Sequence, residues 1–343
     1  MRVLLLTNWD RTVPSSRMWF YQMHELLLAR GYQVDLNTFG NEPYDIAVVF
    51  RCIPDLVHKV LLHSPNAHVG VFHPGLEPLV EVNSNVDFYI IASFLWKELL
   101  LPFNRRVYQH FDFFDPRGKE CKEHVKRDNL ILGYHGNEIH YSKHFFPNVA
   151  DALRRLASEF DFTLKVVIAN PGKKPRISGV KSVFVPWELE TFEKEIASFD
   201  IGLCPALSHM SELSEPNTYI RNPNRNILLL FYGIPSITSP IPQNAQVLEH
   251  GKTAFFAISE TGWYHYLREL MLDPDLRNRI GRAGCEMVNA RFSFDAAAEA
   301  YVSILIEEMK QPLFKKNTSL LVVGKRPPIT AMLKAVGRRL LKA

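Results

Sequence analysis

The residues best suited to chemistry in this sequence are basic side chains and histidines that follow short apolar runs. Arg221 precedes a helical stretch, and Arg225 lies at its start. A guanidinium there can bind two phosphate oxygens at once, or it can be exposed to solvent without a ligand. His73 and His135 each end a strand-like run, where an imidazole can hydrogen-bond a ligand or can be a satisfied loop residue. These residue types can serve a phosphate-bearing ligand, and each also has an ordinary structural role.

Other kinds of site have less support. His140 and His144 are four residues apart, but no third metal ligand is evident and Lys143 between them would repel a cation. No motif presents the two carboxyl groups that a glycoside hydrolase needs. No GxGxxG follows the first apolar run, Arg2–Leu6, which argues against a Rossmann dehydrogenase. Neither a disulfide framework nor a zinc site is suggested by the four widely spaced cysteines, at 52, 121, 204 and 285.

Length and composition fit an ordinary globular protein. The 343 residues exceed the roughly 150 of one compact unit, and 47% are hydrophobic. The most apolar stretch, residues 227–241, is interrupted by glycine and proline, so no membrane span is expected. The first residues, MRVLLLTNWD, read as a strand and not as a signal peptide. A cytoplasmic protein is therefore predicted.

The elements that must position these residues alternate along the chain. Short strand-like runs and helical segments follow one another from Arg2 to Ala92, and the alternation restarts at Leu130. Between them, the polar, charge-dense residues 115–129 are typical of a linker between domains. This pattern predicts an α/β fold with two doubly wound, Rossmann-like domains and ligands at the carboxyl ends of the strands. The predicted boundaries are 1–127, 128–310 and a basic tail, 311–343.

Several stretches together resemble the bacterial branch of the retaining glycosyltransferases of family 4, which have the two-domain GT-B fold. The stronger matches are VPW at 185–187, FDIGLCPA at 199–206, NRNILLLFYGIPSITSPIPQNAQVLEHGKTAFFA at 224–257 and LRNRIGRAGCEMVNARFSFDAAAEAY at 276–301. Looser matches are PSSR at 14–17, VDFYIIASFLWKELL at 86–100 and LGYHGNEIHYSK at 132–143. The resemblance ends near Met309.

The resemblance implies a metal-independent transfer of a hexose-type sugar from a nucleotide diphosphate donor on the second domain to an acceptor on the first. Arg225 stands where the family has a lysine in the pattern NK, and Lys143 is the nearest second cation, with Arg221 a further donor contact. Gly136 permits close approach of the backbone. Transfer with retention of configuration needs positive charge at the phosphates more than a protein base. The expected catalytic residues are His73, His135 and Arg225.

This sequence departs from the family at the ribose site. Many members carry two glutamates eight residues apart, but here these positions are Ile220 and Leu228, and Gln246 replaces a third glutamate. The predicted substitutes are Asn226, Asn244 and Glu215. Trp187 falls where the family places the nucleobase, so it is a stacking candidate, with core packing as the alternative.

On the first domain, Ser15, Ser16 and Arg17 are the predicted acceptor contacts, because hydroxyls at a helix N-terminus favour anionic groups; a plain helix cap is the alternative. The tail holds nine Lys or Arg and no acid from residue 310 onward. Apolar positions 329, 333, 336 and 340 make residues 328–343 a short basic amphipathic helix, which could bind an anionic membrane or pack on the body or a partner.

The sequence thus predicts a nucleotide-sugar-dependent glycosyltransferase of cell-envelope polysaccharide biosynthesis. Its acceptor would be lipid-linked or a polysaccharide, and the enzyme would be peripheral on the inner membrane face. No nucleic acid partner, metal or other cofactor is expected. Because the glutamates are missing, a non-catalytic sugar-nucleotide-binding subunit is the main alternative. A nucleotide-sugar epimerase is a third, which would need flanking acid and base carboxylates.

Overall fold

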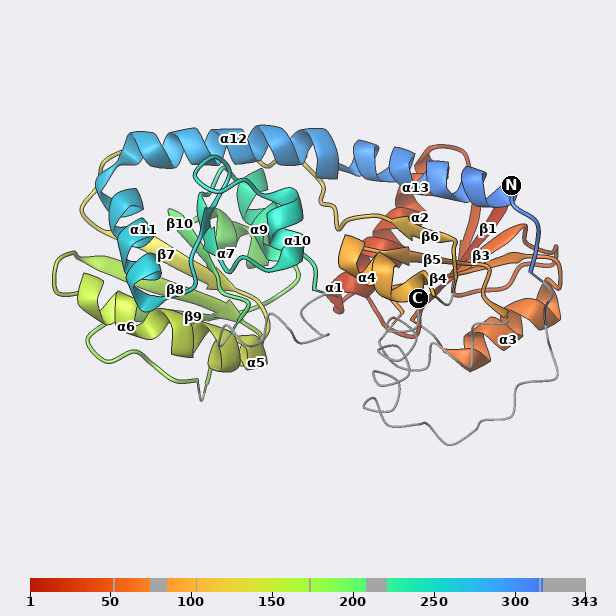
Figure 1. Ribbon diagram of the computed structural model, residues 1–343, viewed down its shortest axis with the longest axis horizontal. Helices are drawn as coiled ribbons and strands as arrows, with labels where there is room; N and C mark the ends of the chain where they lie inside the picture. Colours follow the sequence, from red (N-terminus) through yellow and green to blue (C-terminus); the bar gives the residue numbers. More distant parts are fainter. Residues whose placement is uncertain are drawn as a thin grey trace. The chain divides into compact units, whose positions relative to one another are not determined.

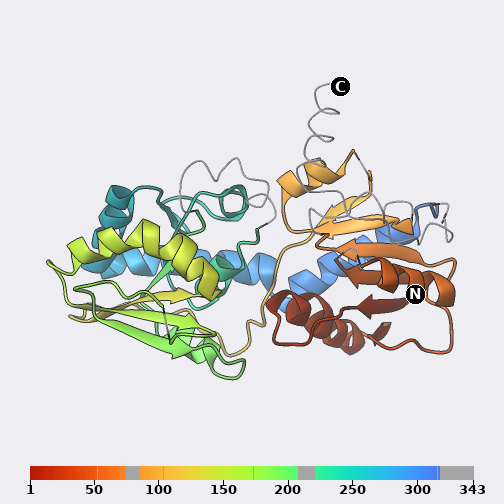
Figure 2. The ribbon, with the colours of Figure 1, turned by 90° about the horizontal axis from the view of Figure 1, so that it is seen from below.

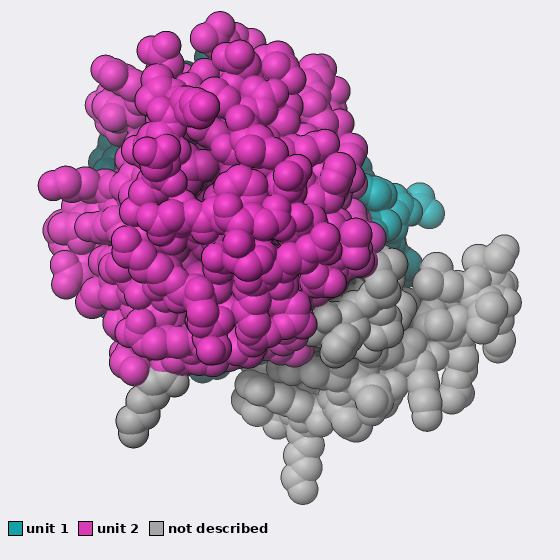
Figure 3. Space-filling view, turned by 90° about the vertical axis from the view of Figure 1, so that its left-hand side faces the viewer, with its two compact units in different colours: residues 1–112, 294–343 teal, residues 113–293 magenta. Residues whose placement is uncertain are grey.

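The computed structural model describes residues 1–51, 53–74, 85–102, 104–172, 174–207, 221–314 and 316. The chain divides into two compact units, coloured separately in Figure 3. Unit 1 is Met1–Asp112 together with the chain from Phe294 onward, and unit 2 is Phe113–Ser293. Two domains were predicted, but the boundaries are different: the segment 113–127 belongs to unit 2, and the helix that begins at Phe294 belongs to unit 1.

The elements alternate as the sequence indicated (Figure 1). Unit 1 contains β1 (Arg2–Leu6), α1 (Pro14–Ser16), the π-helical turn η1 (Arg17–Gln22), α2 (Met23–Ala29), β2 (Gln33–Leu36), β3 (Ile46–Phe50), α3 (Pro54–His63), β4 (His68–Phe72), β5 (Phe88–Ile91), α4 (Phe94–Leu100), β6 (Val107–Gln109) and α13 (Phe294–Met309). Unit 2 contains β7 (Leu130–His135), α5 (Glu138–His140), the π-helical turn η3 (Tyr141–Phe145), α6 (Phe146–Leu156), β8 (Phe162–Ile168), β9 (Ser182–Pro186), α7 (Phe192–Ala197), β10 (Ile201–Cys204), α9 (Asn224–Phe231), β11 (Ser236–Thr238), α10 (Pro242–Val247), β12 (Phe255–Phe256), α11 (Glu260–Leu272) and α12 (Pro274–Phe292). Within the described ranges, no helix combines the length and the apolar character that crossing a membrane requires.

The sheet of unit 1 is parallel, with strand order β2-β1-β3-β4-β5-β6. Its central strands β3 and β4 are buried along their whole length, which explains their continuous apolar sequences, since a parallel sheet is covered on both faces. The register is regular: Val3 lies opposite Val34 on one side and Ile46 on the other. The predicted doubly wound architecture is confirmed.

Helix α13 is fixed to the sheet of unit 1 by a buried carboxylate. Glu308 has no exposed surface. Its oxygens accept hydrogen bonds from Arg106 Nη1 at 2.9 Å and from the Tyr108 hydroxyl at 3.0 Å, and His68 Nδ1 lies 3.0 Å away. A buried charge is tolerable only when it is paired and hydrogen-bonded in this way. The last described helix is therefore an integral part of the first domain.

Unit 2 has a second parallel sheet, with strand order β12-β11-β10-β7-β8-β9 (Figures 1 and 2). Helices α6 and α11 pack together on one face, where Leu153 and Leu267 join the strand residues in one apolar cluster. Helices α7 and α9 cover the other face through Ile196 and Leu229. The long helix α12 packs on α9.

The segment 113–127, here called the connector, runs beside α12. The Asn278 side chain accepts from the His124 amide at 2.7 Å and donates to its carbonyl at 2.8 Å. The buried Arg277 guanidinium donates to the Val125 carbonyl at 2.9 Å, and the Lys122 ammonium pairs with buried Asp200 at 3.0 Å. The charged residues of the connector, which suggested a solvated linker, thus include some that attach it to unit 2.

Candidate functional site

The strand order of unit 2 creates a place for a ligand. From β7 the chain proceeds to β8 and β9 on one side of the sheet and later to β10, β11 and β12 on the other. Parallel sheets bind ligands outside the carboxyl ends of the strands where the order reverses, which here is the edge between β7 and β10. These strands end at His135 and Cys204, so residues just beyond them form the candidate site.

Arg225 reaches this edge from the first turn of α9. Its Nη2 lies 3.4 Å from the Pro205 carbonyl oxygen, just beyond β10, and its guanidinium carbon is 5.7 Å from the ring centroid of Tyr134 on β7. The other terminal nitrogen, Nη1, is buried and has no hydrogen-bond partner in the described part of the chain. Buried donors are nearly always paired, so this cationic N–H is available for a ligand atom.

Gly136 lies directly below the Arg225 side chain. Its φ of +149° is a conformation that side chains rarely adopt, and its amide donates to the Val167 carbonyl at 3.2 Å. A Cβ placed here would lie 3.2 Å from Arg225 Cδ and 3.2 Å from the Tyr134 hydroxyl. Glycine therefore leaves room for the arginine, and close approach of a donor to the backbone here remains a prediction.

His135 contacts the same helix turn. Its Nε2 lies 3.2 Å from the carbonyl oxygen of Arg225, and because a carbonyl can only accept, this nitrogen carries the proton. Burial and, to a smaller extent, the Arg225 charge lower the pKa of His135 to about 3. The ring is therefore neutral at pH 7, and it holds the start of α9 in place by donating to its backbone.

Further basic residues gather around the site. Burial and, to a smaller extent, the charges of Arg225, Arg221 and Lys143 lower the pKa of His140 to about 4, so all three cations act at this imidazole. Arg221 Nη2 lies 3.5 Å from His144 Nε2, while Lys143 is exposed on the π-helical turn η3. The structure thus brings together Arg225, Arg221, Lys143, Gly136 and His135.

Two residues at this edge were missed as site residues by sequence reasoning. Tyr134 was treated as part of a strand, although its ring supports the guanidinium of Arg225. His140 was considered only as a metal ligand; its ring centroid is 5.3 Å from that of His144, and no group of three metal-binding side chains occurs among the described residues. The GYHGNEIH stretch contained both, but only the fold shows that the cations converge there.

Asn226 and Asn244 lie beneath the site. They are 3% and 2% exposed, and the amide of Asn226 donates to Asn244 Oδ1 at 3.3 Å. Asn244 also donates to Thr238 Oγ1 and to the Ser239 carbonyl, both at 2.8 Å. This arrangement ties the start of α9 to the end of β11 and to α10, whereas direct contact of either amide with a ligand remains a prediction.

Trp187 follows β9 at the same edge of the sheet. Its amide donates to the Ile168 carbonyl at 2.9 Å, and its ring centroid lies 5.1 Å from that of Phe192. The ring is partly buried against the apolar cluster under α7, so the structure supports the packing alternative, and a stacking role remains a prediction. Glu215 lies outside the described residues, as do residues 328–343 of the tail.

The residues predicted on unit 1 lie after β1. Ser16 is fully buried: its hydroxyl donates to the Trp9 carbonyl at 2.7 Å and lies 3.0 Å from Thr7 Oγ1. It therefore anchors the loop after β1 to the helix, and acceptor binding by its hydroxyl is not evident. Ser15 is partly exposed, and Arg17 donates from Nη1 to the Arg11 carbonyl at 2.9 Å.

Backbone strain marks the carboxyl edge of the unit 1 sheet. Asn37, Arg51 and His73 each follow the last residue of a strand, and each has a positive φ, between 50° and 60°. Such conformations in residues other than glycine cost about 1–3 kcal/mol each and cluster at functional sites. Sequence reasoning missed Arg51, whose guanidinium lies 5.1 Å from the ring of Trp9.

His73 is the one of these three positive-φ residues that the sequence singled out. Its ring lies edge-on to Trp96 with centroids 4.7 Å apart, and its Nδ1 is buried without a hydrogen-bond partner in the described ranges. Burial and, to a smaller extent, the charge of Arg51 lower the pKa of His73 to about 4. The imidazole is therefore neutral at pH 7.

Comparison with known proteins identifies the architecture. No protein-family model matches the sequence, and no curated protein sequence matches it either. Solved structures do match. Sucrose-phosphate synthase from Thermosynechococcus elongatus has 12% identity and a TM-score of 0.65, with 90% of this chain and 98% of that chain covered. The chain has the GT-B fold.

Two other GT-B structures show the same likeness. The lipopolysaccharide outer core galactosyltransferase WaaB is 11% identical, with a TM-score of 0.62 over 90% of this chain and all of that one. HepE from Anabaena, solved in complex with UDP and glucose, is 11% identical, with a TM-score of 0.61 over 89% of this chain and 99% of that one. The GT-B fold predicted from the sequence is confirmed.

Proposed function

We propose that this protein is a glycosyltransferase that takes a hexose-type sugar from a nucleotide diphosphate donor bound by unit 2. The observation that carries the proposal is Arg225, whose buried Nη1 has no hydrogen-bond partner among the described residues and lies with Gly136 at the carboxyl edge where β7 and β10 meet. A planar guanidinium suits the oxygens of a diphosphate, and the backbone at Gly136 leaves room for it.

The electrostatics of the edge suit a leaving group that gains negative charge. The positive charges at this edge come from Arg225, Arg221 and Lys143. His135 and His140 are neutral and serve as hydrogen-bonding groups. Removing one well-placed donor to such a charge typically costs about 100-fold to 1000-fold in rate. In the proposed reaction the diphosphate oxygen accepts the acceptor's proton as the bond to the sugar breaks, with retention of configuration and without a metal ion.

A uridine nucleotide is the first donor to test, because HepE, which shares the fold, was solved with UDP. Under this proposal Trp187 and Glu215 are the candidates for the base and the ribose. Asn226 and Asn244 then have an indirect role: their hydrogen bonds fix the start of α9 and so the position of Arg225.

The acceptor is proposed to bind at the carboxyl edge of unit 1. Ser15, Arg17 and His73 are the candidates from the sequence, and Arg51 beside Trp9 adds a cation and an aromatic face. Such a surface suits a sugar that carries an anionic group. We propose a cell-envelope glycan, in line with WaaB, and a peripheral, cytoplasmic location in which residues 328–343 bind an anionic membrane.

One observation favours the alternative of a binding subunit without catalytic activity. Leu228, at a position where many family members have glutamate, is 2% exposed and packs in the core under α7 and α9. The structure therefore offers no carboxylate there, and donor binding without turnover would fit this alternative.

The experiment is a thermal-shift screen with UDP, GDP, ADP, CMP, TDP and their common sugars. A ligand at one hundred times its dissociation constant should add about 2.7 kcal/mol to the stability. If no nucleotide or sugar nucleotide shifts the melting temperature, the donor site is wrong. Transfer of labelled sugar from the identified donor to envelope lipid extracts then distinguishes an enzyme from a non-catalytic binding subunit.

A separate experiment tests the tail. The full chain and a chain ending at residue 325 are floated with anionic vesicles, and only the full chain should bind them.

A further inference from the structure

Two thiols far apart in the sequence meet where the connector passes α12. Cys121, on the connector, is exposed, and its Sγ lies 3.9 Å from the carbonyl oxygen of Gly281. Cys285 lies one turn farther along α12, and a helical side chain leans back over the preceding turn. The two sulfurs therefore lie close together, and each thiol perturbs the pKa of the other.

The packing around the pair is close. The Cys285 thiol lies 3.8 Å from the Phe231 carbonyl at the end of α9. A Cβ on Gly233 would lie 2.6 Å from the Cys121 sulfur, and a Cβ on Gly281 would lie 2.0 Å from the Gly233 carbonyl oxygen. Only glycine fits at both positions, so the connector, α9 and α12 approach one another closely around the two thiols.

The two thiols differ in reactivity. The neighbouring Cys285 thiol and, to a smaller extent, the Arg282 guanidinium lower the pKa of Cys121 to about 7, so much of this exposed sulfur is thiolate near neutral pH. The neighbouring Cys121 sulfur, together with burial, raises the pKa of Cys285. Asn289 Nδ2 lies 3.5 Å from the Cys285 sulfur and can stabilise it as that proton leaves.

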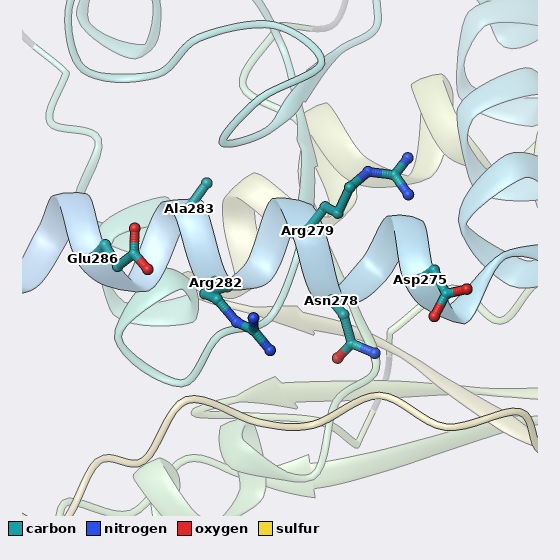
Figure 4. Close-up of a pocket in the computed structure, with 6 residues that line it drawn as sticks. All are labelled: Asp275, Asn278, Arg279, Arg282, Ala283 and Glu286. Carbon is teal, nitrogen blue, oxygen red and sulfur yellow. The ribbon is translucent and has the colours of Figure 1, made fainter.

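A small molecule can reach Cys121 from the surface of α12. A shallow depression of about 530 Å³ runs along this helix and is lined by Asp275, Asn278, Arg279, Arg282, Ala283 and Glu286 (Figure 4). Asn278 and Arg282 point to the same side of the helix, and Asn278 bonds the connector. Arg282 and Glu286 are also the two charges that act on Cys121, so the depression lies beside this thiol.

We propose that Cys121 and Cys285 form a reversible disulfide that joins the connector to α12. The oxidant is a low-molecular-weight disulfide, RSSR. The Cys121 thiolate attacks one sulfur of RSSR, forms a mixed disulfide and releases one thiolate. Cys285 then loses its proton and attacks the Cys121 sulfur, and the second thiolate leaves. The two cysteines are oxidised, and RSSR is reduced to two RSH.

The other cysteine with a described environment does not compete. Cys204 ends β10 in the core, and burial raises the pKa of its thiol to about 11. Cys285 is also buried, but it attacks a sulfur that is already held beside it, whereas Cys204, which is 1% exposed, would have to meet RSSR from solvent. Oxidation is therefore expected to select the pair on the surface of unit 2.

The test uses the reduced, folded full chain and oxidised glutathione. The expected product is lighter by two hydrogen atoms, carries no glutathione, and on peptide mapping without reductant shows Cys121 linked to Cys285. Dithiothreitol should restore two maleimide-reactive thiols. A stable glutathione adduct on the wild-type chain, or a disulfide that includes Cys52 or Cys204, would overturn the proposal.

Single substitutions assign the two steps. Cys285→Ser should stop the reaction at the mixed disulfide on Cys121, and Cys121→Ser should prevent reaction at Cys285. Arg282→Ala should slow the first step at pH 7, because it raises the pKa of Cys121, whereas Arg154→Ala on the distant end of α6 should leave the rate unchanged. Equal rates for the two arginine variants would remove the electrostatic activation from the proposal, while circular dichroism verifies that each variant is folded.

Discussion

Arg225→Ala should separate the stability of the protein from its affinity for the donor. Without a ligand, the guanidinium has one long hydrogen bond, at 3.4 Å, and one buried N–H with no partner in the described residues. A buried donor without a partner costs about 1–3 kcal/mol, and one weak hydrogen bond with a cation–π contact contributes about 1–2 kcal/mol. These terms nearly cancel, so the free energy of unfolding should change by less than about 1 kcal/mol.

With a nucleoside diphosphate bound, the balance is different. Two hydrogen bonds from the guanidinium to phosphate oxygens contribute about 1.5 kcal/mol each at the low end of their range. Their loss raises the dissociation constant by a factor of roughly 150. Isothermal titration calorimetry with UDP, and with whichever nucleotide the screen identifies, measures this change, and urea unfolding of the unliganded chains measures the stability.

Two variants control this experiment. Arg225→Lys keeps the charge but loses the planar fork, so its affinity should lie between those of the wild type and the alanine variant. Arg154→Ala removes an exposed arginine from the far end of α6 and should change neither quantity. The reasoning is refuted if Arg225→Ala binds nucleotide as well as Arg154→Ala does, or if it loses several kcal/mol of stability without a ligand.

Three further predictions concern backbone, core and pH. Gly136→Ala should cost about 1–2 kcal/mol of stability, because alanine is strained at this positive φ, and it should weaken nucleotide binding, because its Cβ would crowd Arg225. Urea unfolding measures the stability and calorimetry the affinity. A wild-type affinity would contradict the placement of Gly136 in the donor site. Glu308→Ala should lower the free energy of unfolding, measured in urea, by about 3–5 kcal/mol, because it leaves the Arg106 guanidinium and the Tyr108 hydroxyl without their acceptor. A loss below about 1 kcal/mol would show that the carboxylate does not fix α13 to the sheet. Folding lowers the pKa values of His124 and His135 to about 4 and about 3, from an unfolded value near 6.5. The unfolded chain therefore binds more protons between pH 6.5 and 4, and stability should fall as the pH falls through this range, by up to about 2 kcal/mol per histidine at pH 5. Urea unfolding at pH 7 and pH 5 should show a smaller loss in His135→Gln, and an equal loss would refute the role of this histidine.

The fold was predictable because it depends on patterns that repeat. Buried runs such as Ile46–Phe50 and His68–Phe72 are apolar on both faces, and this together with the intervening helices indicates a parallel sheet. The domain boundaries were less predictable, because charge suggested a solvated linker at 115–129. Charge alone does not show that Lys122 finds Asp200 or that Asn278 bonds the connector.

The site was predictable in part. Arg225 and Gly136 stood out by residue type and by resemblance, and the fold places them in contact. The buried amides of Asn226 and Asn244 could not be foreseen as partners, because 18 residues separate them and the contact depends on how β11 lies beside β10. Arg51 gave no signal, since its positive φ is a property of the folded backbone and not of its residue type.

The discontinuity of unit 1 has a consequence for biosynthesis. Domains generally fold as units while the chain emerges from the ribosome, N-terminal part first. Here the first 112 residues appear early, but Glu308, which joins His68, Arg106 and Tyr108 in the core of the same unit, is made only after all of unit 2. The core that begins first is therefore completed last, and unit 2 can complete its own core while unit 1 still lacks its final helix.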